Sequence, residues 1–243
     1  MKPEETELPE LDMERIAADE ARGVKFSGDK RTLEKFPGTS SIREYTIPDG
    51  VTDIKAGAFQ GAINLRIVNI PESVRNIGAF AFEICLSMEK VNFSNGLTNI
   101  ENCAFYGCRS LTSLDLPRSL TSIGEEAFCD CDSLKTVNMC EGLTLLGYHA
   151  FCDCHNLQQV TIPGSMNKIS FGAFRWCTGL TAAHIREGVT SIESFAFGGC
   201  AKLTDVDIPD SVTSIDEAAF YRCPCMERPW IKRLVESRLS KDQ

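Results

Sequence analysis

The sequence lacks the segments that would carry it into or across a membrane. None of its apolar runs is long enough to span a bilayer as a helix. Its first residues, MKPEETELPELDMERIAADEA, lack the apolar stretch of a secretory signal. We therefore expect a cytoplasmic protein. The alternative is a secreted or cell-surface protein whose export signal is missing from this sequence.

The sequence also has few of the features that catalysis or nucleic-acid binding requires. Its net charge is −9 and no basic stripe is present, which argues against a nucleic-acid partner. We find no nucleophile motif, no glycine-rich phosphate loop and no His-Glu pair at helical spacing. Its three histidines, His149, His155 and His184, share no spacing that suggests a catalytic base. We expect a protein that is not an enzyme and has no cofactor.

What the sequence does contain is one motif repeated at a fixed period. An Ala-Phe dipeptide recurs every 23 residues without insertion or deletion. A constant period of this length is typical of a leucine-rich repeat solenoid, in which each unit buries its apolar side against the next. The eight repeat phenylalanines are Phe59, Phe82, Phe105, Phe128, Phe151, Phe174, Phe197 and Phe220.

Each repeat predicts two short strands and a tight turn. In the last copy Val206 and Ile208 alternate with polar residues, which indicates a half-buried strand, and Pro209 ends it. A second extended piece reaches Ile215, and we expect the following Ala-Phe segment to form a single helical turn. The predicted fold class is an α/β solenoid of about eight 23-residue coils with short parallel strands.

Most of the twelve cysteines follow the same period. Seven of them lie three residues after a repeat phenylalanine and so form one column. Free cysteine packs like a small apolar residue, so we interpret the column as a buried thiol ladder suited to a reducing compartment. Disulfides and metal ligation are the alternatives. The column comprises Cys85, Cys108, Cys131, Cys154, Cys177, Cys200 and Cys223.

The two ends depart from the repeat and predict caps. Residues 1–22 are interpreted as an acidic arm or a short helix, and residues 23–44 as a β-hairpin that caps a solenoid over 23–226. Residues 227–243 predict a C-terminal helix. It either caps the last repeat or binds a partner, with its apolar residues Ile231, Leu234, Val235 and Leu239 on one face.

The sharpest candidate for a metal site is CDCD at 129–132 with CDCH at 152–155, plus His149, because zinc favours thiolate and imidazole ligands. Cys131 and Cys154 belong to the core column and should point inward, so four sulfurs would not converge. We therefore expect no metal. Cys129 and Cys152 are stacked neighbours, and an adventitious disulfide between them is the alternative.

Two surfaces are candidates for binding. Phe171 and Trp176 occupy positions that are mostly polar or small in other copies. Nearby, Met166 and Ala183 give the core a more flexible and a smaller side chain. We interpret residues 166–183 as a local distortion or a contact surface. The other candidate is the outward strand face, which is either a partner site or merely solvated. Its residues are Lys90, Asn92, Ser113, Asp115, Thr136, Asn138, Gln159, Thr161, His184, Asp205 and Asp207.

The repeat resembles the BspA-like, or Treponema-type, leucine-rich repeat. IPESVRNIGAFAFEIC at 70–85 and IPDSVTSIDEAAFYRC at 208–223 carry the likeness, which covers about residues 24–223. The resemblance implies a right-handed solenoid that binds a protein ligand. Family members are often bacterial surface or secreted proteins that engage host or matrix proteins.

We expect a non-enzymatic protein-interaction module. An adhesin-type protein is the second hypothesis, and a structural or metal-storing protein, based only on the cysteines, is the third.

Overall fold

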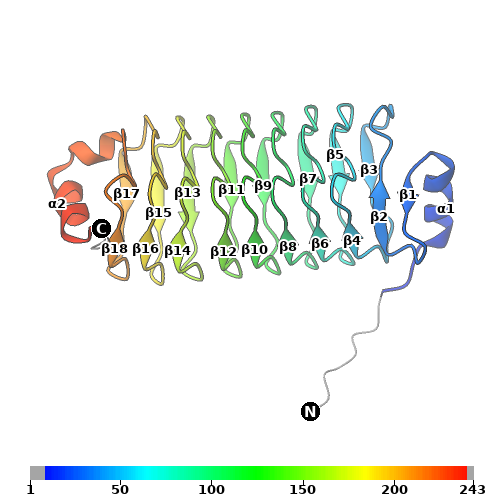
Figure 1. The fold of residues 1–243 in the computed structure, drawn as a ribbon, viewed down its shortest axis with the longest axis horizontal. Coiled ribbons are helices and arrows are strands. Elements are labelled where there is room, and N and C mark those ends of the chain that lie inside the picture. Colours follow the sequence, from blue (N-terminus) through cyan, green and yellow to red (C-terminus); the bar gives the residue numbers. More distant parts are fainter. Residues whose placement is uncertain (1–8, 240–243) are drawn as a thin grey trace, which may run out of the picture.

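The computed structural model describes residues 9–239. The first eight residues of the predicted acidic arm and residues 240–243 of the predicted C-terminal helix lie outside this range. The chain forms a single stack of coils with helix α1 at one end and helix α2 at the other (Figure 1). No helix among residues 9–239 has the length and apolar character needed to cross a bilayer.

Each coil contributes one strand to each of two rows, and the strands within a row are parallel. Paired residues are 23 apart, except at the first step of the second row, where Thr32 pairs with Asp53. This confirms the predicted parallel solenoid. The first row contains β3 (Glu44–Thr46), β5 (Ile67–Asn69), β7 (Lys90–Asn92), β9 (Ser113–Asp115), β11 (Thr136–Asn138), β13 (Gln159–Ile162), β15 (Ala182–Ile185) and β17 (Asp205–Asp207). The second row contains β2 (Thr32–Lys35), β4 (Asp53–Ile54), β6 (Asn76–Ile77), β8 (Asn99–Ile100), β10 (Ser122–Ile123), β12 (Leu145–Leu146), β14 (Lys168–Ile169), β16 (Ser191–Ile192) and β18 (Ser214–Ile215).

Both rows are interrupted once. The first row forms one sheet from β3 to β7 and another from β9 to β17. The second runs unbroken to β12, and β14, β16 and β18 form a separate sheet. The two breaks lie at different steps of the solenoid, so the stack stays continuous while each sheet opens locally.

The repeat phenylalanines form one file of stacked rings through the core. Ring centroids are 4.6 Å apart for Phe59 and Phe82 and 5.6 Å apart for Phe151 and Phe174, the shortest and longest steps between repeat copies. Phe36, 23 residues before Phe59, extends the file at a centroid distance of 4.8 Å. Strand pairing sets this step at about 4.8 Å, so the backbone brings the rings into contact.

The cysteine column lies beside this file and has a specific partner. Each thiol donates a hydrogen bond to the carbonyl oxygen of the repeat phenylalanine one coil back, as in Cys131 to Phe105 at 3.4 Å and Cys177 to Phe151 at 3.1 Å. All twelve cysteines are free. Burial raises the pKa of Cys131 and Cys154, which keeps both thiols protonated. The cysteine column therefore contributes both core packing and hydrogen bonds between coils.

The Ala-Phe segment is a turn, which corrects the expected helical turn. Glu126 and Asp130, on either side of Phe128, have φ of 53° and 58°, in the left-handed region that ends a right-handed helix. The same two positions are left-handed in most coils. They are Gly57, Phe80, Cys103, Glu126, His149, Gly172 and Phe195 before the phenylalanine, and Gly61, Ile84, Gly107, Asp130, Asp153, Trp176, Gly199 and Arg222 after it.

The N-terminal end is covered by helix α1 (Met13–Ala21) and by strand β1 (Lys25–Phe26), which pairs antiparallel with β2. Asp12 caps the helix by accepting from the Arg15 amide, and Ile16 is buried. Asp19 is also buried and accepts a 2.7 Å hydrogen bond from the Tyr45 hydroxyl, which ties the helix to the first coil.

The C-terminal end is covered by a 3₁₀ turn, η1 (Pro224–Glu227), followed by helix α2 (Pro229–Ser237). Pro229 occupies the first turn of the helix, where its missing N–H costs nothing. Ile231 and Val235 are buried, whereas Leu239 is 40% exposed and bridges to Ile215. Helix α2 therefore covers the last coil with Ile231 and Val235, two apolar side chains that lie one helical turn apart.

We predict that Phe128→Ala lowers the free energy of unfolding by about 3–5 kcal/mol, because it leaves a cavity inside the ring file. Asp132→Ala, on the half-exposed rim of the same coil, should change it by less than about 0.5 kcal/mol. Thermal or denaturant unfolding of the two variants measures both. A larger loss for Asp132→Ala would contradict the assigned core.

We also predict that relieving backbone strain in one turn stabilises the protein. Ile84 is β-branched, has φ of 56° and is 44% exposed, so Ile84→Gly should raise the free energy of unfolding by about 1 kcal/mol. Gly107 occupies the same position one coil later with φ of 69°, and Gly107→Ala should lower it by about 1 kcal/mol. Urea unfolding that gave the opposite signs would argue against left-handed turns.

Candidate binding surfaces

The outward strand face consists of side chains that largely bind one another. In each of these strands the central side chain is buried and its neighbours point outward. Asn138 donates to Asp115 at 2.5 Å, and His184 pairs with Asp207 at 2.6 Å. The predicted residues occupy β7 (Lys90, Asn92), β9 (Ser113, Asp115), β11 (Thr136, Asn138), β13 (Gln159, Thr161), β15 (His184) and β17 (Asp205, Asp207).

The structure does not bring all of these residues onto one sheet. Lys90 and Asn92 lie on β7, in the sheet that ends there, whereas the others lie on the sheet from β9 to β17. Asn92 donates back to Asn69 at 2.6 Å, within its own sheet. The face offers a polar ladder with its hydrogen bonds already made, and its role in binding stays a prediction.

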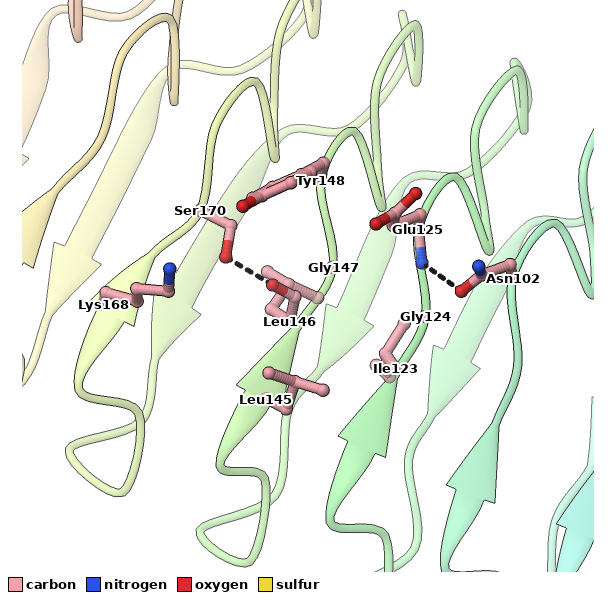
Figure 2. A pocket seen from close by; sticks show the side chains of 10 residues that line it. All are labelled: Asn102, Ile123, Gly124, Glu125, Leu145, Leu146, Gly147, Tyr148, Lys168 and Ser170. Atoms are coloured by element: carbon pink, nitrogen blue, oxygen red, sulfur yellow. Dashed lines mark hydrogen bonds between the residues drawn. The ribbon is translucent and has the colours of Figure 1, made fainter.

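The break between β12 and β14 opens the other side of the solenoid. One coil earlier the Gly147 amide donates to the Ile123 carbonyl oxygen at 2.8 Å. At the next step the buried Ser170 donates through its hydroxyl, reaching the Leu146 carbonyl at 2.5 Å (Figure 2). At this step the Ser170 hydroxyl, in place of a backbone amide, donates the hydrogen bond that links the two coils. This distortion lies within the region 166–183 that the sequence singled out.

A pocket of about 260 Å³ lies at this break (Figure 2). Leu145, which is 52% exposed, stands where earlier coils have Asn76, Asn99 and Ser122. Drug-sized ligand sites are typically about 300–1,000 Å³, so this pocket suits a single side chain better than a substrate. It is lined by Asn102, Ile123, Gly124, Glu125, Leu145, Leu146, Gly147, Tyr148, Lys168 and Ser170.

Next to the pocket begins a row of aromatic side chains on the turns of four consecutive coils. Tyr148, Phe171, Phe195 and Tyr221 meet edge to face, with centroid distances of 6.3, 6.0 and 5.8 Å along the row. Tyr148 and Tyr221 are 47% and 48% exposed. Together with Trp176 we call these residues the aromatic strip.

Arginines and glycines hold the strip in place. The Arg175 guanidinium lies 5.8 Å from the Trp176 ring and 5.2 Å from the Phe195 ring, within the range of cation–π attraction. A Cβ atom at Gly199 would lie 2.3 Å from the Trp176 ring, so this glycine makes room for it. Arg222 similarly lies 5.2 Å from the Tyr221 ring.

Sequence reasoning identified Phe171 and Trp176 but missed Tyr148, Phe195 and Tyr221. Tyr148 lies 23 residues before Phe171, in the same repeat column, whereas Phe195 and Tyr221 occupy two other repeat positions. A count of aromatics over all turn positions of neighbouring copies would have found them. A smaller group of exposed apolar side chains, Ile63, Phe80, Ile84 and Leu86, lies on the first coils.

A family model described as "BspA type Leucine rich repeat region" matches residues 33–158 and 98–227, most of the solenoid. The chain belongs to the BspA-type leucine-rich repeat family. The expectation drawn from the repeat motif is thereby confirmed.

Solved structures of leucine-rich repeat proteins are similar to this chain. A Treponema pallidum leucine-rich repeat protein is 26% identical with a TM-score of 0.66, and the match covers 90% of this chain and 94% of that one. A Bacteroides ovatus leucine-rich repeat protein is 31% identical with a TM-score of 0.68, covering 82% of this chain and 51% of that one. This chain thus spans about half of the Bacteroides protein. No curated protein matches the sequence.

The Ala-Phe turns of successive coils form one edge of the solenoid, which we call the turn edge. This edge also carries a partly exposed thiol, Cys103. Burial and the nearby carboxylates of Glu126 and Glu83 raise its pKa to about 11. Because only the thiolate reacts, we predict that its alkylation rate rises about tenfold per pH unit from pH 7 to pH 10. Mass spectrometry of iodoacetamide-treated protein measures this. A plateau below pH 9 would show that the acidic surroundings do not act on this thiol.

Proposed function

We propose that this BspA-type repeat protein is a non-enzymatic scaffold that binds a protein partner through the aromatic strip. The observation that carries the proposal is the unbroken edge-to-face row from Tyr148 to Tyr221, with arginines packed against it. Aromatic residues and arginine are the types enriched at the energetic centres of protein interfaces.

The geometry of the strip supports binding because its rings are already ordered. Phe171 contacts Tyr148 on one side and Phe195 on the other, so its rotamer is fixed before a partner arrives. Ordering a free side chain at an interface costs about 0.5–1.5 kcal/mol, and a preorganised ring avoids most of that cost. The strip therefore offers apolar area at little entropic cost.

The pocket beside Tyr148 supplies a matching anchor point. Leu145 and Leu146 are among the residues that line it, and its size fits one apolar side chain of a partner. Lys168 at the rim is held by Glu193 at 2.7 Å, and this hydrogen bond raises the lysine pKa. Lys168 thus stays an ammonium ion at neutral pH and is unsuited to act as a base or nucleophile, which favours a recognition role for the pocket.

We predict that Phe195→Asn combined with Tyr221→Ser removes partner binding while leaving the melting temperature within about 3 °C. Asparagine tolerates the left-handed backbone at 195, where φ is 52°, so the fold should not suffer. The measurement is affinity capture from the native source, in both cell extract and medium, with quantification of the proteins retained by wild type and variant. Capture of a partner from only the cell extract or only the medium would also show whether the protein acts inside or outside the cell.

Two matched variants make the result specific. Phe80→Asn changes a phenylalanine at the same repeat position, with φ of 57° and 43% exposure, but outside the strip, and should retain the partner. Asn138→Arg with Thr161→Arg alters the strand face and should also retain it. If the strand-face variant alone lost binding, the predicted face would be the site. If wild type retained no protein above the bare matrix, the scaffold role would be wrong.

A further inference from the structure

Two thiols and a carboxylate meet on the turn edge, outside both candidate binding surfaces. Cys129 and Cys152 follow the repeat phenylalanine directly in adjacent coils, and Asp153 comes next in the chain. The two sulfurs and a carboxylate oxygen lie within 4.8 Å of one another. The cysteines are 8% and 7% exposed, so the cluster lies just beneath the surface, within reach of a solvated ion.

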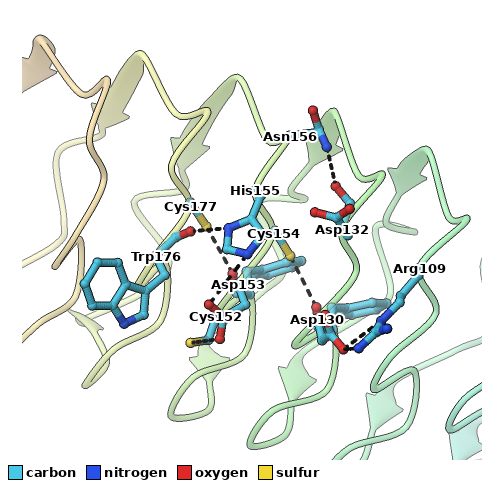
Figure 3. Close-up of polar contacts among 12 residues, drawn as sticks. Arg109, Asp130, Asp132, Cys152, Asp153, Cys154, His155, Asn156, Trp176 and Cys177 are labelled. Atoms are coloured by element: carbon cyan, nitrogen blue, oxygen red, sulfur yellow. Dashed lines mark hydrogen bonds and ion pairs between the residues drawn. The ribbon is translucent and has the colours of Figure 1, made fainter.

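The structure separates these two thiols from their neighbours in the Cys-x-Cys pairs. Cys131 and Cys154 donate to the carbonyl oxygens of Phe105 and Phe128 at 3.4 and 3.3 Å, inside the core, and Figure 3 shows Cys154 in this role. A four-sulfur site is therefore excluded by geometry, as the sequence indicated. The outer pair, however, gains an oxygen ligand that sequence reasoning did not consider.

The spacing of the cluster suits a tetrahedral metal ion. With metal–sulfur and metal–oxygen bonds of about 2.3 and 2.0 Å, tetrahedral zinc holds sulfur and oxygen ligands about 3.5 Å apart and two sulfurs about 3.8 Å apart. The Cys152 thiol lies 3.3 Å from Asp153 Oδ2. Small side-chain rotations thus suffice to close the three donors around an ion.

A disulfide is the alternative that the sequence left open, and the spacing of the coils permits it. Stacked coils keep aligned backbones about 4.8 Å apart, and a disulfide accepts Cα atoms about 4.4–6.8 Å apart. Both thiols are free in the structure, so the metal site is a property of the reduced protein. The Asp130 amide donates to the Cys152 carbonyl at 3.0 Å across this step, and that contact holds the turns at their normal separation.

The orientation of Asp153 distinguishes this coil from its neighbour. Asp130 occupies the same position one coil earlier, but Arg109 binds it through two nitrogens at 2.6 and 3.0 Å (Figure 3). Among residues 9–239, no arginine binds Asp153 in this way. Its Oδ1 lies 4.0 Å from His155 Nε2, and its Oδ2 turns to the Cys152 thiol. One carboxylate is thus neutralised and the other stays available.

We propose that Cys129, Cys152 and Asp153 form a three-ligand site for a thiophilic divalent cation of the zinc class. Both thiols release their protons to solvent as the ion binds, and the fourth tetrahedral position is left to water. Because the ligands come from two coils, the bound ion joins adjacent turns, and it stabilises the stack by an amount that grows with the logarithm of the free ion concentration above Kd.

The test is titration of the reduced full-length protein with Cd²⁺ alone, followed by ultraviolet thiolate-to-metal absorption and calorimetry. We expect one ion bound to two thiolates per chain, displaced by Zn²⁺, and a rise in melting temperature on binding. Cys129→Ser and Cys152→Ser should each weaken binding about 100-fold, and Asp153→Asn about tenfold.

Two variants serve as controls, Cys103→Ser on the same turn edge and Asp130→Asn at the equivalent carboxylate. Both should bind Cd²⁺ as wild type does. The site would be overturned if reduced wild type bound no Cd²⁺ at micromolar concentration, if the absorption reported a single thiolate, or if Cys103→Ser removed binding. Unchanged affinity in Asp153→Asn would overturn the oxygen ligand. Melting curves of each metal-free variant establish that any loss is not unfolding.

Discussion

The backbone hydrogen bonds that link each turn to the next coil are the constraint on which the structure depends. The Phe105 amide donates to the Ala127 carbonyl and the Phe128 amide to the Ala150 carbonyl, each at 2.8 Å and 22 residues apart. These bonds set the rise between coils at the spacing of paired strands, and the rings stack at 5.1 Å as a result. A coil of a different length would break this register, which is why the period tolerates no insertion.

The cysteine column adds hydrogen bonds to carbonyls that the turn leaves inside the core, where an unsatisfied acceptor would cost about 1–3 kcal/mol. In most coils the repeat phenylalanine carbonyl already accepts from the amide three residues later, as in Cys108 to Phe105 at 3.2 Å, and the thiol adds a second bond, as in Cys131 to Phe105 at 3.4 Å. The thiol of Cys154 satisfies the Phe128 carbonyl at 3.3 Å while remaining small enough to pack beside the rings. Each 23-residue repeat therefore supplies hydrogen bonds to buried carbonyl oxygens as well as core packing, because the ring, the carbonyl and the thiol recur together.

The sequence predicted what depends on repetition. The solenoid, its parallel strands, the ring file and the buried thiols all follow from residues that recur at one spacing. The turn conformation did not follow, because left-handed residues such as Glu126 and Phe195 are not types that signal a positive φ. The aromatic strip was only half predicted, since Phe195 and Tyr221 lie at different repeat positions and meet only in the folded stack. The opening at Ser170 depends on one hydroxyl replacing one amide, which no periodicity reveals.

The left-handed turn positions are filled in two ways. Glycine occupies them without strain, and Gly57 and Gly172 do so. Phe80, Ile84, Phe195 and Trp176 instead hold bulky side chains there, at a cost of about 1–3 kcal/mol each. Phe195 and Trp176 recover part of this cost through the Arg175 guanidinium, which lies 5.2 Å from the Phe195 ring and 5.8 Å from the Trp176 ring. Phe80 and Ile84 are 43% and 44% exposed, so packing returns less of theirs. Strained turns therefore occur both on the first coils and on the coils that carry the strip, and core packing alone explains neither group.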